Sequence, residues 1–167
     1  MSFDACLPII LASEGGFTVD QGGPTCLGVT QRTLSSFLGR AASIDEVKAL
    51  TPETVAPLYR ANFYHAAHCD ELAPGVDLMV FDEAINEGVG RAVRHLQQAL
   101  GVKVDGAFGP KSLEAAAKAN RIDLVNRLHD TNGAYYDSLA SIYPQDERGW
   151  HSRNDRTRDA ALAMIKP

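Results

Sequence analysis

Two acids and a hydroxyl of types that act in catalysis lie close together near the start of the chain: Glu14, Asp20 and Thr25. An apolar stripe at helical spacing precedes Glu14 and is formed by Phe3, Leu7 and Ile10. Because these residues share one helix face with Glu14, we expect its carboxyl group to face the interior or a cleft wall. Desolvation there would raise the carboxyl pKa, so the group could stay protonated near neutral pH and donate a proton.

A short loop rich in glycine and proline follows Glu14 and carries the other two groups. Gly15 and Gly16 end the predicted helix, and Asp20 and Thr25 come next. A protonated acid beside a second acid and a hydroxyl fits glycoside hydrolysis, in which one carboxyl group protonates the leaving oxygen. The alternative is a solvated acid at a helix end, which has a small cost because it opposes the helix dipole.

Composition limits the other function classes. The 167 residues can form one compact core or two small subdomains, and 45% hydrophobic with 22% charged residues is ordinary for a globular protein. The net charge of −5 argues against a nucleic-acid partner. Three cysteines are an odd and sparse set, which favours reduced thiols over a disulfide framework.

The first residues do not form a good secretory signal. Residues 1–10 hold no Lys or Arg, and Pro8 interrupts the apolar run. No stretch approaches transmembrane length. We therefore expect synthesis in the cytoplasm without a signal peptide. If the target lies outside the inner membrane, release requires a partner pore, a dedicated secretion route or lysis.

Local signals predict a mainly helical chain. We expect a first helix over 2–14, a helix begun by Thr30 and further starts at Ser43 and Thr51. A long helix is expected over about 81–100, with a kink at Gly88 and Gly90. Later helices are expected at about 110–119, from Asp123 to Pro144, and at about 153–165.

The glycine-rich stretch also carries a family resemblance. Its pattern Glu14-Gly15-Gly16, then Asp20-x-Gly22-Gly23-x-Thr25-x-x-Gly28-Val29-Thr30, resembles the Glu-Gly-Gly muramidases of glycoside hydrolase family 108, which include phage endolysins and secretion-associated lysozymes. The loop after Glu-Gly-Gly is shorter here than is usual in that family. The resemblance implies a lysozyme-like helical bundle with a small loop or hairpin after the first helix, acting as a monomer on bacterial peptidoglycan.

The resemblance resumes in the second half. The stretch from Phe81 to Ala92 is similar to the start of the family's peptidoglycan-binding segment, and it suggests that Asp82 and Asn86 line the cleft. The alternative is that they brace a kink at Gly88. The stretch Asp105-Gly106-Ala107-Phe108-Gly109-Pro110 resembles the repeat of peptidoglycan-binding modules, so we expect a catalytic module over 1–74 and a binding segment over 75–167.

Aromatic residues near the end have two interpretations. Tyr135 can stack on a sugar ring or belong to the core, and Trp150, in the family's closing Gly-Trp-x-x-Arg signature, can floor a sugar subsite or anchor the last helix. Arg153 of that signature is a candidate partner for Asp82.

We expect no cofactor and no metal. His65, His68 and Cys69 lie within one turn, but a fourth ligand is not visible nearby, so partly buried polar groups are the favoured interpretation.

The resemblance also implies a mechanism. Glu14 would protonate the glycosidic oxygen between N-acetylmuramic acid and N-acetylglucosamine. Asp20 would orient a water molecule or stabilise positive charge, and Thr25 would hold that water. Thr30 would contact the glycan. Inversion is favoured, which requires carboxyl groups about 6.5–9.5 Å apart. Two alternatives stay open: a lytic transglycosylase, and a wall-binding module without catalysis.

Overall fold

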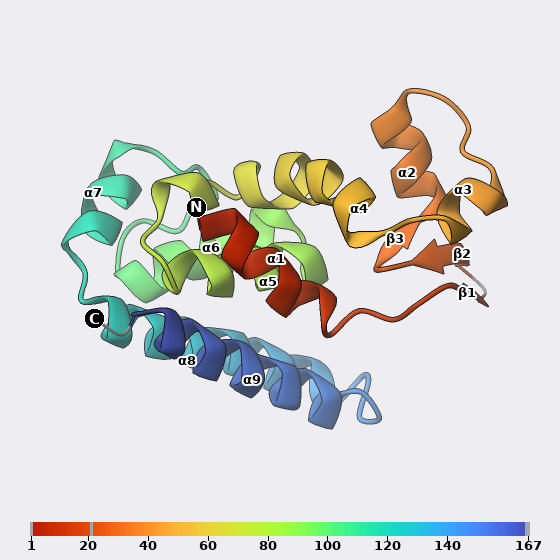
Figure 1. The fold of residues 1–167 in the computed structure, drawn as a ribbon. Coiled ribbons are helices and arrows are strands. Elements are labelled where there is room, and N and C mark those ends of the chain that lie inside the picture. The colour runs from red at the N-terminus through yellow and green to blue at the C-terminus, as the bar shows by residue number, and fades with distance from the viewer. Residues whose placement is uncertain (1, 21, 166–167) are drawn as a thin grey trace. The chain divides into compact units, whose positions relative to one another are not determined.

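The computed structural model describes residues 2–20 and 22–165, without the side chain of Asp20. Contacts divide these residues into two compact units, one over Phe3–Asn62 and the other from Phe63 onward with Ser2 (Figure 1). The predicted division after residue 74 stays a prediction. No described helix is both long enough and apolar enough to cross a membrane.

The first unit combines helices with a small antiparallel sheet. In chain order its elements are α1 (Ser2–Leu11), β1 (Thr18–Asp20), β2 (Gly23–Cys26), β3 (Val29–Thr30), α2 (Gln31–Leu38), α3 (Ile44–Lys48) and α4 (Pro52–Tyr59). The sheet has the order β1-β2-β3, with each strand antiparallel to the next. Helix α4 passes into a π-helix, η1 (Arg60–His65), where the sequence predicted a continuing α-helix.

Helix α1 is shorter than the predicted span of 2–14. It contains Pro8 and ends at Leu11, and its buried residues include Phe3, Leu7 and Ile10. After the helix, turns form in which Ser13 N–H donates to the Ile10 carbonyl and Glu14 N–H donates to the Leu11 carbonyl. Glu14 therefore lies in a bend after the helix, and the predicted apolar face is present up to Ile10.

The predicted helix starts in this unit are confirmed. The Thr30 hydroxyl accepts a hydrogen bond from Thr33 N–H and caps α2, which ends at Gly39 in the left-handed conformation. Ser43 forms a complete capping box with Glu46 before α3. Thr51 caps α4 in front of Pro52 at its first position.

Helices are the only regular secondary structure among the described residues of the second unit. Its elements are η2 (Cys69–Glu71), α5 (Val76–Asn86), α6 (Val89–Leu100), α7 (Pro110–Lys118), α8 (Arg121–Ala140) and α9 (Glu147–Ile165). Helices α8 and α9 lie side by side (Figure 1).

Several predicted helix boundaries in the second unit are wrong. Among them, α5 begins at Val76 and α8 ends at Ala140. The expected long helix over 81–100 is two helices, because Gly88 takes φ +87° and ψ 148°, which breaks the helical path instead of kinking it. Helix α8 begins at Arg121, since Asn120 caps it through Asp123 N–H. Helix α9 begins at Glu147, six residues before the predicted start at about 153.

Helix α5 is buried on almost every side although it carries three acids. Asp77 accepts hydrogen bonds from the Tyr64 hydroxyl at 2.7 Å and from the Gly75 N–H at 2.8 Å. Glu83 pairs with His95, and burial, acting against this pair, raises the Glu83 pKa. Asp82 pairs with Arg153. Each buried carboxyl group thus has a partner, as the cost of burying an isolated charge requires.

Candidate active site

Glu14 lies beside a tight turn between β2 and β3. Its side chain is half-buried. The turn contains Leu27 at φ +48° and Gly28 at φ +72°, and left-handed conformations of this kind are unusual for a residue such as leucine. The Leu27 N–H donates a 3.0 Å hydrogen bond to the carbonyl oxygen of Gly15. This bond fixes the β2–β3 turn against the residue that follows Glu14.

Gly28 brings the turn into direct contact with the Glu14 carboxyl group. A Cβ atom added at Gly28 would lie 2.8 Å from Glu14 Oε2 and 2.5 Å from the Tyr59 hydroxyl oxygen. A Cβ atom does not fit in that space, and the positive φ is unfavourable for other residues. Both reasons require glycine at position 28. Glu14 Oε2 and the Tyr59 hydroxyl oxygen therefore both lie close to the Gly28 backbone.

Tyr59 ties the same turn to α4. Its side chain is 1% exposed, and its hydroxyl donates a 2.8 Å hydrogen bond to the Leu27 carbonyl. The turn that touches Glu14 is therefore held at two points, one on the segment after α1 and one on α4. Such support fixes the backbone that lies beside the Glu14 carboxyl group.

Thr25 lies in a row of threonines across the sheet. In the strand register it is paired with Thr18 of β1 and with Thr30 of β3. Because directly paired residues of neighbouring strands point to the same face, the three hydroxyls share one face of the sheet. Thr25 is half-buried, whereas the hydroxyl of Thr30 caps α2. The side chain of Asp20 lies outside the described residues.

Comparisons with known proteins identify the family. A model described as glycosyl hydrolase 108 matches residues 7–88, and a model described as a predicted peptidoglycan domain matches residues 91–155. A solved structure of SagA from Brucella abortus is 38% identical, covers 99% of this chain and 96% of its own, and has a TM-score of 0.86. The chain belongs to the glycosyl hydrolase 108 family. A search of curated proteins found no match.

Membership in the glycosyl hydrolase 108 family establishes the general activity. The protein is a glycoside hydrolase of lysozyme type, and the peptidoglycan domain supports peptidoglycan as its substrate. The predicted fold class, mainly helical and lysozyme-like with a small hairpin after the first helix, is confirmed.

The remaining predicted site residues lie in the second unit. Asp82 is 6% exposed and accepts hydrogen bonds from Arg153 Nε at 3.0 Å and from Arg153 Nη2 at 2.9 Å. The predicted pairing of these two residues is thereby confirmed. Asn86 is exposed and donates a 2.7 Å hydrogen bond from Nδ2 to the Asp82 carbonyl, one helical turn earlier.

The two predicted aromatic residues are engaged by neighbouring rings and cations. The Arg91 guanidinium lies over the Tyr135 ring, with Cζ 4.1 Å from its centroid. Trp150 is half-buried and stacks on Tyr136, with ring centroids 5.8 Å apart. These contacts show how α8 and α9 hold the two aromatic side chains; contact with a sugar stays a prediction for both.

The three residues weighed as metal ligands do not converge within the described part of the chain. His65 bonds to Asp70 and His68 to Glu71, each through Nδ1, while Cys69 is buried. His65 and His68 therefore turn to separate carboxylates.

Sequence reasoning missed Tyr59 as part of the site. The sequence placed it on the apolar face of a helix, and nothing local distinguishes it from a core tyrosine. Its hydrogen bond joins residues 32 positions apart, a contact that helical spacing cannot show.

The buried pair of Asp82 and Arg153 gives a stability prediction. Replacement Arg153→Ala leaves the Asp82 carboxylate buried without its partner, so we expect a loss of about 3 kcal/mol in the free energy of unfolding. Urea unfolding followed by circular dichroism measures it. Arg156→Ala is the control, since exposed Arg156 bonds only to Ser152 in the described structure; equal midpoints for the two variants would contradict the assigned role of the pair.

Proposed function

We propose that the protein is an N-acetylmuramidase that cleaves the β-1,4 bond between N-acetylmuramic acid and N-acetylglucosamine, with Glu14 as the general acid. The observation that supports this most is the Glu14 carboxyl group, half-buried and in contact with the Gly28 turn. Glu14 lies in the segment that matches the glycosyl hydrolase 108 model, and its carboxyl group contacts a supported backbone turn, as expected of a proton donor.

In the proposed reaction, Glu14 gives its proton to the glycosidic oxygen while positive charge develops at the sugar ring. The bond from the anomeric carbon to that oxygen breaks, and the leaving sugar departs as a neutral hydroxyl. A water then adds to the anomeric carbon and its proton passes to a base. We assign the base or charge-stabilising role to Asp20 and the holding of the water to Thr25.

The second matched segment supports a division of labour. We propose that residues 1–74 carry out the cleavage and that residues 75–167 bind peptidoglycan strands, with Asp82, Asn86, Tyr135 and Trp150 on the binding side and Thr30 on the catalytic side. The protein would work as a monomer at the cell wall, after release through a holin or a secretion pore.

The first test is the substitution of the proposed acid. Glu14→Gln keeps the shape of the side chain but removes the donated proton, so hydrolysis of purified peptidoglycan should fall by about 100-fold or more, the usual range for general acid catalysis. Release of soluble muropeptides measures the rate, and thermal unfolding verifies the fold.

A matched control is available in the same unit. Glu53→Gln makes the same chemical change at an exposed residue in the first turn of α4 and should keep the wild-type rate. If Glu14→Gln degrades peptidoglycan as fast as Glu53→Gln, Glu14 is not the acid.

The second test separates hydrolysis from transglycosylation by the product. Addition of water leaves a new reducing end on each N-acetylmuramic acid, whereas a lytic transglycosylase leaves an anhydro end that is lighter by one water. Mass spectrometry of digested peptidoglycan should show reducing ends. Anhydro ends as the main product would replace the muramidase assignment with its rival.

A further inference from the structure

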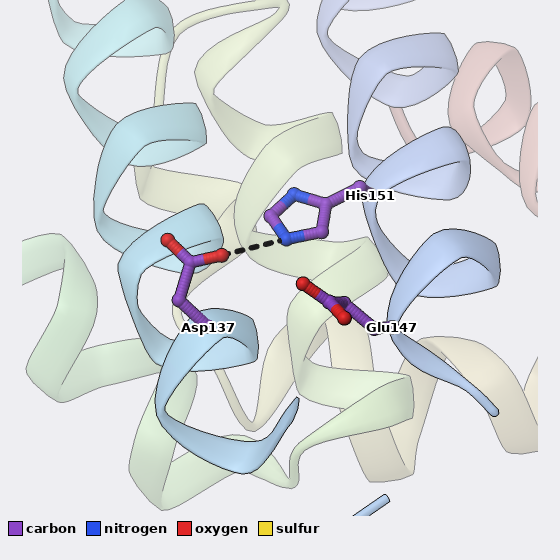
Figure 2. A group of neighbouring side chains, drawn as sticks. All are labelled: Asp137, Glu147 and His151. Carbon is purple, nitrogen blue, oxygen red and sulfur yellow. Dashed lines mark hydrogen bonds and ion pairs between the residues drawn. The ribbon is translucent and has the colours of Figure 1, made fainter. Parts of the chain in front are cut away.

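Three potential metal ligands meet where α8 and α9 lie side by side. Glu147 and His151 are four residues apart on α9, so they share one helix face, and Asp137 lies near the end of α8. One ligand atom from each lies within 4.8 Å of the other two, and His151 Nε2 is 2.9 Å from Asp137 Oδ1. Figure 2 shows the carboxylates of Asp137 and Glu147 near the edge of the His151 ring whose nitrogen bonds to Asp137.

A second histidine between the same helices shows what distinguishes this group. His129 also contacts two carboxylates, but Asp130 lies on its Nδ1 at 3.2 Å and Asp155 on its Nε2 at 2.9 Å. The two ring nitrogens point in opposite directions, so a single ion cannot bind both carboxylates together with the ring. At His151 the three donors surround one point.

The donor set indicates the class of ion. Imidazole with carboxylates suits Zn²⁺, whereas Mg²⁺ and Ca²⁺ prefer oxygen ligands alone. Zinc bonds of about 2.0–2.2 Å require donors roughly 3.4 Å apart. The 2.9 Å pair of His151 and Asp137 would therefore open slightly, and donors that now lie up to 4.8 Å apart would approach, which rotation of the exposed Asp137 and half-buried Glu147 side chains allows. The Asp137 side chain is 68% exposed, so solvent reaches this group and a water molecule can serve as the fourth ligand.

We propose that Asp137, Glu147 and His151 form a binding site for a zinc-class divalent cation that links α8 to α9. Two carboxylates and a neutral imidazole give a charge of −2, which one divalent ion balances. The ion would join the two helices across the connecting residues 141–146 and thereby stabilise this pair. The site is separate from the chemistry proposed for Glu14, and it requires no change in oxidation state.

The test is titration of the tag-free, EDTA-dialysed full chain with zinc chloride, followed by isothermal titration calorimetry. The wild type should bind one zinc ion per chain, and saturating zinc should raise its thermal unfolding temperature. His151→Gln and, separately, Glu147→Gln should weaken zinc affinity by at least tenfold and lose the thermal shift. Magnesium chloride should give no binding.

Two variants serve as matched controls. His129→Gln removes the other histidine–carboxylate contact between the same helices, and Glu14→Gln alters the proposed catalytic acid; both should bind zinc like the wild type. Circular dichroism verifies the fold of each variant. Absence of stoichiometric zinc binding by the wild type, or undiminished binding by both His151→Gln and Glu147→Gln, would overturn the site.

Discussion

The close approach of Gly28 to the Glu14 carboxyl group is the constraint on which the proposed site depends. A backbone without a Cβ atom lies where any side chain would meet Glu14 Oε2 at 2.8 Å. The turn stays there because the Leu27 N–H bonds to Gly15 and the Leu27 carbonyl accepts from Tyr59. One turn of the sheet thus connects the end of α1, the hairpin and α4 around a single acid, and this contact explains why the motif has glycine at position 28.

Three acids of the second unit are buried on one helix. On α5, Asp77, Asp82 and Glu83 are buried and each is engaged by a partner, so these carboxyl groups stabilise the packing of the helix. Arg153, from the closing signature of the sequence, is the partner of Asp82. The acids of α5 thus serve the packing of a helix, whereas the Glu14 carboxyl group is half-buried beside the backbone of Gly28.

Local chemistry explains what could be predicted from the sequence. The starts of α2, α3 and α4 were found correctly because the capping groups of Thr30, Ser43 and Thr51 act within three residues of themselves. The break at Gly88 was expected only as a kink, because the sequence does not state which conformation a glycine takes.

Long-range contacts explain what the sequence did not show. The bond of Tyr59 to Leu27 spans 32 positions, and the group of Asp137, Glu147 and His151 depends on the packing of α8 against α9. Spacing along one helix indicates only Glu147 and His151 as neighbours. The pairing of Asp82 with Arg153, 71 positions apart, was inferred from residue type without a spacing argument. Residue types within one motif thus pointed to Glu14 as the candidate acid, whereas the contacts of the turn beside it required the fold.

The most direct measurement of the central claim compares Gly28→Ala with Gly39→Ala. Both glycines have positive φ, at +72° and +67°, so both variants should lose about 1 kcal/mol or more of stability from backbone strain. Only the new Cβ at position 28 meets Glu14 and Tyr59, since the Cβ position at residue 39 has nothing within 4 Å. At a temperature where both variants are folded, Gly39→Ala should hydrolyse peptidoglycan at the wild-type rate and Gly28→Ala should be severely impaired; equal rates for the two would contradict the placement of Glu14 as the working acid.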